Sequence, residues 1–142
     1  MKITFVGAGN MAEALVRGLL SSGQAASSDI TVSDISAERL NYFKETFSVG
    51  GETDNGIAVQ NRDVVFLAVK PQLFPSVLPL LKEALSQEAL VISIAAGVPA
   101  SKIEATLAEG VKVVRVMPNT PALVGKGVSA LSAGQHATQD DL

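Results

Sequence analysis

The sequence predicts an α/β fold, in which helices cover both faces of a doubly wound, mostly parallel sheet as three αβα layers. Short, almost continuously apolar runs alternate with longer segments of helical period, as expected for parallel strands joined by right-handed crossovers. The predicted strands are Ile3–Val6, Ile30–Val32, Val64–Val69, Leu90–Ile94, Val111–Val116 and Val128–Ala133. The predicted helices are Met11–Ser22, Ala37–Phe47, Leu73–Ala84 and Ala100–Leu107. The predicted apolar face of the first helix is Met11, Ala14, Leu15, Gly18 and Leu19.

Composition narrows the class of protein. With 142 residues, 47% of them hydrophobic, the chain suffices for one domain with an apolar core. Its net charge is −3 and its 11 Lys and Arg residues are scattered, so we expect no nucleic acid partner. The absence of cysteine excludes a disulfide framework and a thiolate site. No apolar stretch approaches the roughly 20 residues of a membrane-spanning helix, so we expect a soluble, cytoplasmic protein without a membrane partner.

The strongest local motif is a glycine-rich turn, Gly7-Ala8-Gly9-Asn10-Met11-Ala12, between the first strand and the first helix. Gly7 permits the tight turn, Gly9 lets a pyrophosphate approach the backbone, and Ala12 lets the helix pack closely on the sheet. The amides at the helix start then bind the phosphates. We therefore predict a Rossmann-type dinucleotide site here, the alternative being a glycine turn without a ligand.

Ser33-Asp34 follows the predicted second strand, and Asp34 lies 22 positions after Ala12. An acidic residue at this place accepts hydrogen bonds from the ribose hydroxyls of NAD and repels a 2′-phosphate. The alternative is that Asp34 caps the next helix, because Ser36 and Glu38 also resemble a helix start, and both roles are compatible. Asp34 therefore favours NAD(H) over NADP(H).

A third segment, Ala68-Val69-Lys70-Pro71, also follows a predicted strand. Pro71 suits the first turn of the next helix, and Lys70 then lies at the edge of the sheet where ligands bind. The alternative for Lys70 is a solvated lysine at a strand end.

Two later segments are expected at the same edge. In Ser93–Pro99, small residues let a flat ring lie against the backbone. Met117–Ala122 is stiffened by two prolines and offers Asn119 and Thr120 as donors and acceptors.

Acid–base groups are scarce. His136 is the only histidine and falls in a predicted late turn, so we expect it at the surface. No Ser-His-Asp set, carboxylate pair or metal-ligand cluster stands out. The sequence thus indicates a site for a redox cofactor, predicts no metal, and leaves the catalytic residues unknown.

The end of the chain resembles the start of a helix. Thr138 suits an N-cap, and Asp140 and Asp141 suit a first turn. Two interpretations follow: a polar tail, or a longer protein of which this is a part.

Four blocks resemble, in order and at about the right spacing, those of the pyrroline-5-carboxylate reductase family: Gly7–Ala12, Ala68–Pro71, Ser93–Gly97 and Val116–Ala122. The resemblance covers nearly the whole chain, and the Met-Pro-Asn-Thr-Pro block is the most specific part. The family reduces 1-pyrroline-5-carboxylate to L-proline with NADPH or NADH. The cofactor-binding residues implied are Val6, Gly7, Ala8, Gly9, Asn10 and Met11 at the pyrophosphate, Asn55 near the adenosine ribose, Ala68, Val69, Lys70, Pro71, Ala95, Ala96 and Gly97 along the cofactor, and Asn119, Thr120 and Pro121 near the nicotinamide.

Two departures from the family limit the resemblance. The family often has a small or basic residue where this chain has Asp34, and Arg39 lies too far along the next helix to be assigned to a 2′-phosphate. Family members also continue into a helical domain that forms the dimer and most of the imine site. We therefore expect residues 1–142 to be the cofactor-binding domain, inactive and not oligomeric alone.

Two other functions are compatible with the sequence. One is another two-domain dehydrogenase of the β-hydroxyacid type, which the Met-Pro-Asn-Thr-Pro block disfavours. The other is a free-standing NAD(P)-binding regulatory module without catalysis, which the short length and the scarcity of acid–base groups favour.

Overall fold

The computed structural model describes residues 1–119, 121 and 126–142. The strands are β1 (Ile3–Val6), β2 (Ile30–Ser33), β3 (Gly50–Glu52), β4 (Val64–Leu67), β5 (Leu90–Ser93), β6 (Lys112–Pro118) and β7 (Ser129–Ala133). The helices are α1 (Asn10–Ser21), α2 (Ala37–Phe47), α3 (Asn55–Ala58), α4 (Phe74–Lys82) and α5 (Ala100–Thr106), with short 3-10 helices at Ser27–Asp29, Pro71–Leu73 and Gln139–Asp141. Within the described part of the chain, no helix is both long enough and apolar enough to cross a membrane.

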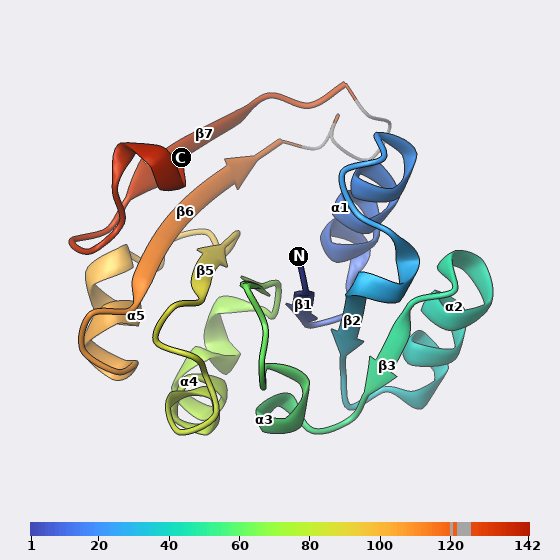
Figure 1. Cartoon of the computed structure of the whole chain (residues 1–142), viewed down its shortest axis with the longest axis horizontal. Helices are drawn as coiled ribbons and strands as arrows, with labels where there is room; N and C mark the ends of the chain where they lie inside the picture. Colours follow the sequence, from blue (N-terminus) through green and yellow to red (C-terminus); the bar gives the residue numbers. More distant parts are fainter. Residues whose placement is uncertain (120, 122–125) are drawn as a thin grey trace.

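The seven strands form one sheet in the order β3-β2-β1-β4-β5-β6-β7. Neighbouring strands are parallel except β6 and β7, which are antiparallel. Because β1 pairs with both β2 and β4, the strand order reverses beside β1 (Figure 1). The predicted doubly wound, mostly parallel α/β fold is therefore confirmed. Ligands of such folds bind beyond the carboxyl ends of the strands, at the reversal.

One face of the sheet packs against α1 and α2. Alternate strand residues point to this face, since side chains in a strand alternate between the two sides. Phe5 of β1 stacks on Phe66 of β4 with the ring centroids 4.5 Å apart. The buried residues of this core are Ile3, Phe5, Ala8, Ala12, Val16, Ile30, Val32, Leu40, Phe43 and Val49.

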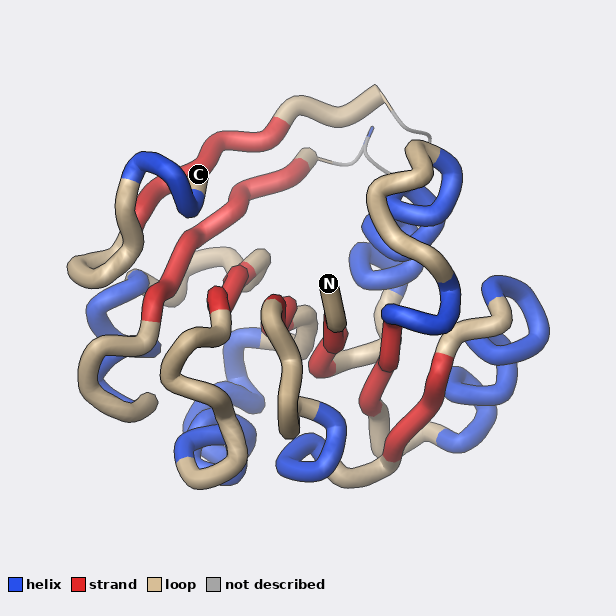
Figure 2. Tube along the Cα trace, in the orientation of Figure 1, coloured by secondary structure: helices blue, strands red, loops and turns tan. Residues whose placement is uncertain are grey.

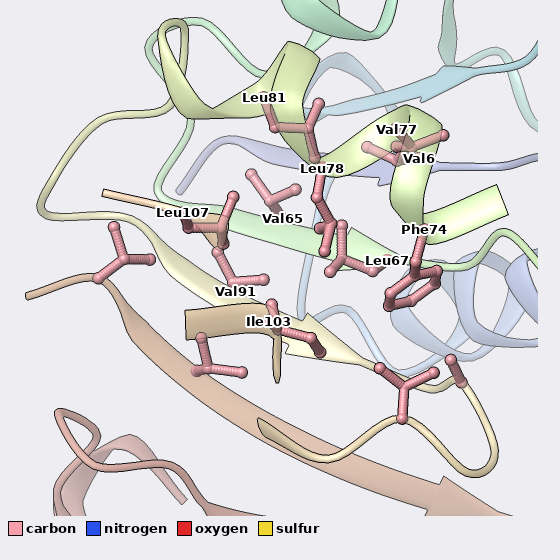
Figure 3. Close-up of a cluster of buried hydrophobic side chains, with 14 of the residues drawn as sticks. Val6, Val65, Leu67, Phe74, Val77, Leu78, Leu81, Val91, Ile103 and Leu107 are labelled. Atoms are coloured by element: carbon pink, nitrogen blue, oxygen red, sulfur yellow. The ribbon is translucent and has the colours of Figure 1, made fainter. Parts of the chain in front are cut away.

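The opposite face packs against α4 and α5, so the strands lie between two groups of helices (Figure 2). Side chains of this second core that Figure 3 labels are Val6, Val65, Leu67, Phe74, Val77, Leu78, Leu81, Val91, Ile103 and Leu107. On the same face, the buried Thr4 hydroxyl donates to the Ala58 carbonyl at 2.7 Å, which ties α3 to β1. The predicted three layers are confirmed.

Two elements between β2 and β4 escaped prediction. β3 consists of Gly50, Gly51 and Glu52, which lack the apolar side chains that mark a strand; pairing with β2 makes it one. The four-residue α3 is capped by Asp54, whose carboxylate accepts from the Ile57 amide at 3.0 Å. Both elements depend on tertiary contacts more than on a local pattern.

Several predicted bounds were wrong. β4 ends at Leu67 and β5 at Ser93, because the chain leaves the sheet there to form the loops at the edge. The helix predicted after Thr138 is only a 3-10 turn, although Thr138 and Asp141 do form a capping box around it.

The buried face of α1 also differs from the predicted one. Ala12, Ala14 and Val16 are buried, whereas Gly18 is exposed and Met11 is half-buried. Ala12 and Val16 belong to the same core as Ala8 of the glycine turn, and the close approach of α1 to the sheet puts these small residues at the centre of its buried face. Apolar periodicity gives leucine more weight than alanine, so the predicted centre of the buried face lies elsewhere on the helix.

Candidate functional site

The loops after the parallel strands all leave the sheet at one edge. Gly7 follows β1, Asp34 follows β2 and Ala68 follows β4. Ala95 and Asn119 lie just beyond β5 and β6. The five segments singled out by sequence therefore lie along the carboxyl edge of the sheet, where open α/β folds bind ligands.

The two glycines of the turn have different physical roles. Gly7 has φ +107°, and a Cβ there would lie 2.7 Å from the Ala68 carbonyl oxygen, so the turn packs directly on the end of β4. Gly9 has φ −80°, and a Cβ there would meet nothing within 4 Å among the residues that the structure describes. Gly7 is thus required by the fold, whereas no described residue occupies the space beside Gly9.

The first turn of α1 presents unpaired donors to that space. Gly9 is the N-cap of α1 and makes no side-chain capping hydrogen bond. The amides of Asn10, Met11 and Ala12 find no acceptor among the residues that the structure describes, and the first helical bond joins the Glu13 amide to the Gly9 carbonyl at 3.0 Å. Such a helix start, with its positive dipole end, binds anions such as phosphates.

Ser33 and Asn55 come together although 22 residues separate them. The buried Ser33 hydroxyl donates to the side-chain oxygen of Asn55 at 2.8 Å. Asn55 opens α3, whose Asp54 cap turns the chain back towards the end of β2. The unpredicted helix therefore carries a predicted site residue into place.

The Asp34 carboxylate joins the turn to the start of α2. One oxygen accepts from the Ala8 amide at 2.9 Å, and the other accepts from the Ser36 amide at 2.9 Å. The N-cap of α2 is Ser36 itself, whose hydroxyl accepts from the Arg39 amide at 3.3 Å. Because a carboxylate has about four acceptor positions, Asp34 retains capacity for two further donors such as ribose hydroxyls.

A cavity of about 300 Å³ lies at this end of the edge. It is lined by Gly7, Ser33, Asp34, Ile35, Asn55, Val69, Leu73, Ser76, Val77 and Leu80. Ile35 is 94% exposed and Leu80 59% exposed, so apolar side chains flank the cavity without being buried in the core. A planar apolar group with a polar, hydroxyl-bearing neighbour, such as a nucleoside, suits this lining.

Sequence reasoning missed half of these lining residues: Ile35, Leu73, Ser76, Val77 and Leu80. Leu73 and Leu80 lie at helical spacing beside the core residues Phe74, Val77 and Leu81, so the segment from Leu73 through α4 carries a second apolar face next to its buried one. The sequence did contain one indication of these lining residues: the apolar surface of this helix is wider than a single core-facing side requires.

The remaining predicted residues line the rest of the edge. Lys70 is exposed at the N-cap of the 3-10 helix that Pro71 opens, as expected for a proline in a first turn. Ala95 is buried, while Ala96 and Gly97 are exposed.

The last predicted segment, Met117–Ala122, begins inside β6, because this strand runs to Pro118 instead of ending at Val116. The Asn119 side-chain oxygen accepts from the Val128 amide at 3.0 Å, and the Pro121 carbonyl accepts from the Lys126 amide at 3.0 Å. Thr120 lies outside the described residues. His136 is exposed, as predicted.

A charged cluster lies beside the glycine turn. The Glu13 carboxylate accepts from the Tyr42 hydroxyl at 2.8 Å and pairs with Arg17 at 3.1 Å and Arg39 at 3.2 Å. Burial raises the pKa of Glu13, but the hydrogen bonds from Tyr42, Arg39 and Arg17 together outweigh it and hold this pKa below its usual value. Glu13 is therefore ionised at neutral pH.

A glycine turn leading into a helix N-terminus, with an acidic residue after β2 and a cavity at the strand reversal, defines a nucleotide-binding domain of the Rossmann class. Within that class, the chain belongs to the family described as "NADP oxidoreductase coenzyme F420-dependent", whose sequence model matches residues 2–97.

Similar proteins confirm the resemblance suggested by the sequence blocks. The chain is 44% identical over 141 residues to a pyrroline-5-carboxylate reductase of Methanosarcina acetivorans, covering 99% of this chain and 52% of that protein. A pyrroline-5-carboxylate reductase structure from Coxiella burnetii superposes with a TM-score of 0.91 at 40% identity, over 98% of this chain and 52% of the other. A pyrroline carboxylate reductase of Plasmodium falciparum with NADP bound has a TM-score of 0.85 at 29% identity, over 99% and 51%. The chain thus spans about half the length of the curated relatives it matches.

Proposed function

We propose that this chain supplies the cofactor-binding domain of an enzyme that reduces 1-pyrroline-5-carboxylate to L-proline with NADH or NADPH. The observation that carries the proposal is the space beside Gly9 that no described residue fills, next to helix amides without an acceptor in the described part of the chain and a cavity of about 300 Å³. The substrate class rests on the similarity to pyrroline-5-carboxylate reductases over 99% of the chain.

The proposed ligand contacts follow the order of the strands. The turn and first helical turn hold the pyrophosphate through Val6, Gly7, Ala8, Gly9, Asn10 and Met11. Ser33, Asp34 and Asn55 face the adenosine ribose, and Ile35, Leu73 and Leu80 flank the adenine. Ala68–Pro71 and Ala95–Gly97 line the middle of the cofactor, and Asn119 and Pro121 lie near the nicotinamide.

Of the two cofactors, we propose NAD(H) as the preferred one, because the Asp34 carboxylate lines the cavity. A ribose 2′-phosphate carries a charge of about −1.5 to −2, and close like charges cost several kcal/mol at a binding interface. A hydrogen bond from Ser33 returns only about 0.5–1.5 kcal/mol. The Plasmodium falciparum relative has NADP bound, so the dissociation constants of both NADH and NADPH should be measured.

A bound reduced nicotinamide supplies the hydride, which adds to the C=N carbon of the cyclic imine while the nitrogen takes up a proton. The contribution of this chain is to hold and orient the dinucleotide against the imine. No residue of the chain is assigned as the proton donor. We propose that a helical domain carries the donor, most of the imine site and the dimer contacts.

The two alternative functions have weaker support. A β-hydroxyacid-type dehydrogenase shares the fold, but relatives that are 44% and 45% identical to this chain are named as pyrroline-5-carboxylate reductases. For a regulatory NAD(P)-binding module, we expect cofactor binding and no turnover of any substrate. Measurements of turnover therefore distinguish the three functions.

A chimera tests the proposal. Residues 1–142 are joined to the C-terminal half of the Methanosarcina acetivorans reductase, and cofactor oxidation is followed with 1-pyrroline-5-carboxylate. We expect the chimera to form proline, a chimera carrying Gly9→Val to form none, and the 142-residue chain alone to bind cofactor without turnover. A folded chimera that binds cofactor yet forms no proline contradicts the proposal that this chain supplies the cofactor-binding domain of such a reductase. Efficient proline formation by the isolated chain contradicts the division of labour between the two halves.

A further inference from the structure

The peptide groups on both sides of Ala8, the residue between the two glycines of the turn, are held by side chains from the β2–α2 segment. Ala8 is 1% exposed. Its amide donates to the Asp34 carboxylate at 2.9 Å, and its carbonyl accepts from Nε of Arg39 at 2.7 Å. The sequence places Arg39 too far along the helix to be assigned to a 2′-phosphate, yet Arg39 reaches the backbone of the turn.

Arg39 is itself held from three sides. Its Nη2 pairs with Glu13 of α1 at 3.2 Å. Its guanidinium lies over the rings of Tyr42 at 4.8 Å and Phe43 at 5.3 Å. The planar guanidinium is well suited to donating to a carbonyl and a carboxylate at once. These contacts fix its position relative to the turn.

The bond to the Ala8 carbonyl also fixes the next amide. The carbonyl of Ala8 and the N–H of Gly9 belong to one planar trans peptide, in which the two groups point in opposite directions. With the carbonyl anchored on Arg39, the Gly9 N–H points away from α2, and it finds no acceptor among the described residues. Because glycine rotates freely about its backbone bonds, this peptide has little other restraint.

We propose that Arg39 is a positioning residue for the dinucleotide. It holds the peptide between Ala8 and Gly9 so that the Gly9 N–H stays available to a pyrophosphate, and it does so without touching the ligand. The inference rests on the proposed function, since it requires that a pyrophosphate bind at the turn.

The test uses the 142-residue chain and two probes. ADP-ribose carries the pyrophosphate, whereas adenosine occupies the same cavity without it. We expect Arg39→Gln to weaken ADP-ribose roughly tenfold, the effect of about one charge-assisted hydrogen bond, and to leave adenosine unchanged. Titrations followed by NMR chemical shifts give both dissociation constants. If Arg39→Gln does not fold, Arg39→Lys keeps one donor, and we expect a smaller loss that is again confined to ADP-ribose.

Arg17 provides the matched control. It pairs with the same Glu13 and lies over the Phe47 ring at 5.1 Å, but it makes no bond to the turn. Arg17→Gln should leave both affinities unchanged. Equal ADP-ribose affinity in wild type and the Arg39 variant, or an equal loss for both probes, overturns the inference alone. Failure of the wild type to bind ADP-ribose overturns the proposed function and this inference together.

Discussion

The two halves of the carboxyl edge of the sheet differ in how far the chain satisfies its own polar groups. In the half formed by β1, β2 and β4, the Gly7 amide donates to the Ser33 carbonyl at 2.8 Å, and the Ser33 hydroxyl donates to Asn55 at 2.8 Å. The Asp34 carboxylate accepts two backbone amides. The strand ends and side chains of this half are thus held by hydrogen bonds within the chain, while the amides of Gly9, Asn10, Met11 and Ala12 find no acceptor among the described residues.

The half formed by β6 and β7 is more open. All five residues of β7 are exposed, and Leu131 is 49% exposed opposite Val116 of β6. The buried Nε of Arg115 has no hydrogen-bond partner in the described part of the chain. The residues proposed to contact adenosine and pyrophosphate therefore lie in the half whose side chains are already held in place, and preorganised groups lose less conformational freedom on binding.

The largest effect is expected at the point where the closed half packs most tightly. Gly7→Ala places a Cβ 2.7 Å from the Ala68 carbonyl at φ +107°. We expect a loss of about 2–5 kcal/mol in the free energy of unfolding, from left-handed strain and overpacking together. Urea denaturation measures it. As the control in the open half, Leu131→Ser should change stability by less than about 0.5 kcal/mol. Similar losses of unfolding free energy in both variants would contradict the proposed difference between the two halves.

A smaller effect is expected on cofactor choice. Asp34→Ser should shift the ratio of the NADPH and NADH dissociation constants roughly tenfold or more towards NADPH, because it removes the charge that opposes a 2′-phosphate. Asp54→Ser is the matched control: Asp54 caps α3 outside the cavity, and serine also caps helices. If the wild type binds NADPH more tightly than NADH, or if Asp34→Ser leaves the ratio unchanged, Asp34 only accepts backbone hydrogen bonds and does not select the cofactor.

The smallest effect concerns pH. The pKa of Glu13 is lowered in the folded chain, so its ionised form contributes stability above its unfolded pKa. The ordinary pKa of this carboxyl is about 4.5, and the contribution is lost as pH falls below it through the lowered pKa of the folded chain. Glu13→Gln should therefore cost about 1 kcal/mol at pH 7 and progressively less below about pH 4. Urea titrations at pH 7 and pH 3 give the two differences, and a constant difference would exclude the charge as the cause.

The sequence predicted the parts of the site whose determinants are local. The turn at Gly7 and Gly9 lies between an apolar strand and a periodic helix, so its place at the sheet edge followed from a dozen adjacent residues. Asn55 was identified only by resemblance, because α3 and β3 form through contacts with β1 and β2. The contact of Arg39 with the turn was not predicted, because its hydrogen bond to the Ala8 carbonyl joins residues 31 positions apart.

The apolar lining was missed for a different reason. Leu73 and Leu80 are leucines, like the buried residues of α4, so residue type does not distinguish them from the core. Only the way α4 packs on the sheet decides which of its apolar faces is buried. Ile35 follows Asp34 in a loop without periodicity. Burial that depends on how elements pack is not encoded in the pattern of any one element.

The central claim is that the open space at Gly9 receives the pyrophosphate of a nicotinamide dinucleotide, and calorimetric titration of NADH into wild type and Gly9→Val tests it most directly. Gly18→Val is the control, because Gly18 also borders open space but lies far along α1. We expect both variants to fold. Gly9→Val should lose more than roughly 100-fold in affinity, the equivalent of about 3 kcal/mol of steric overlap, and Gly18→Val should lose none. Wild-type affinity in a folded Gly9→Val would contradict the claim.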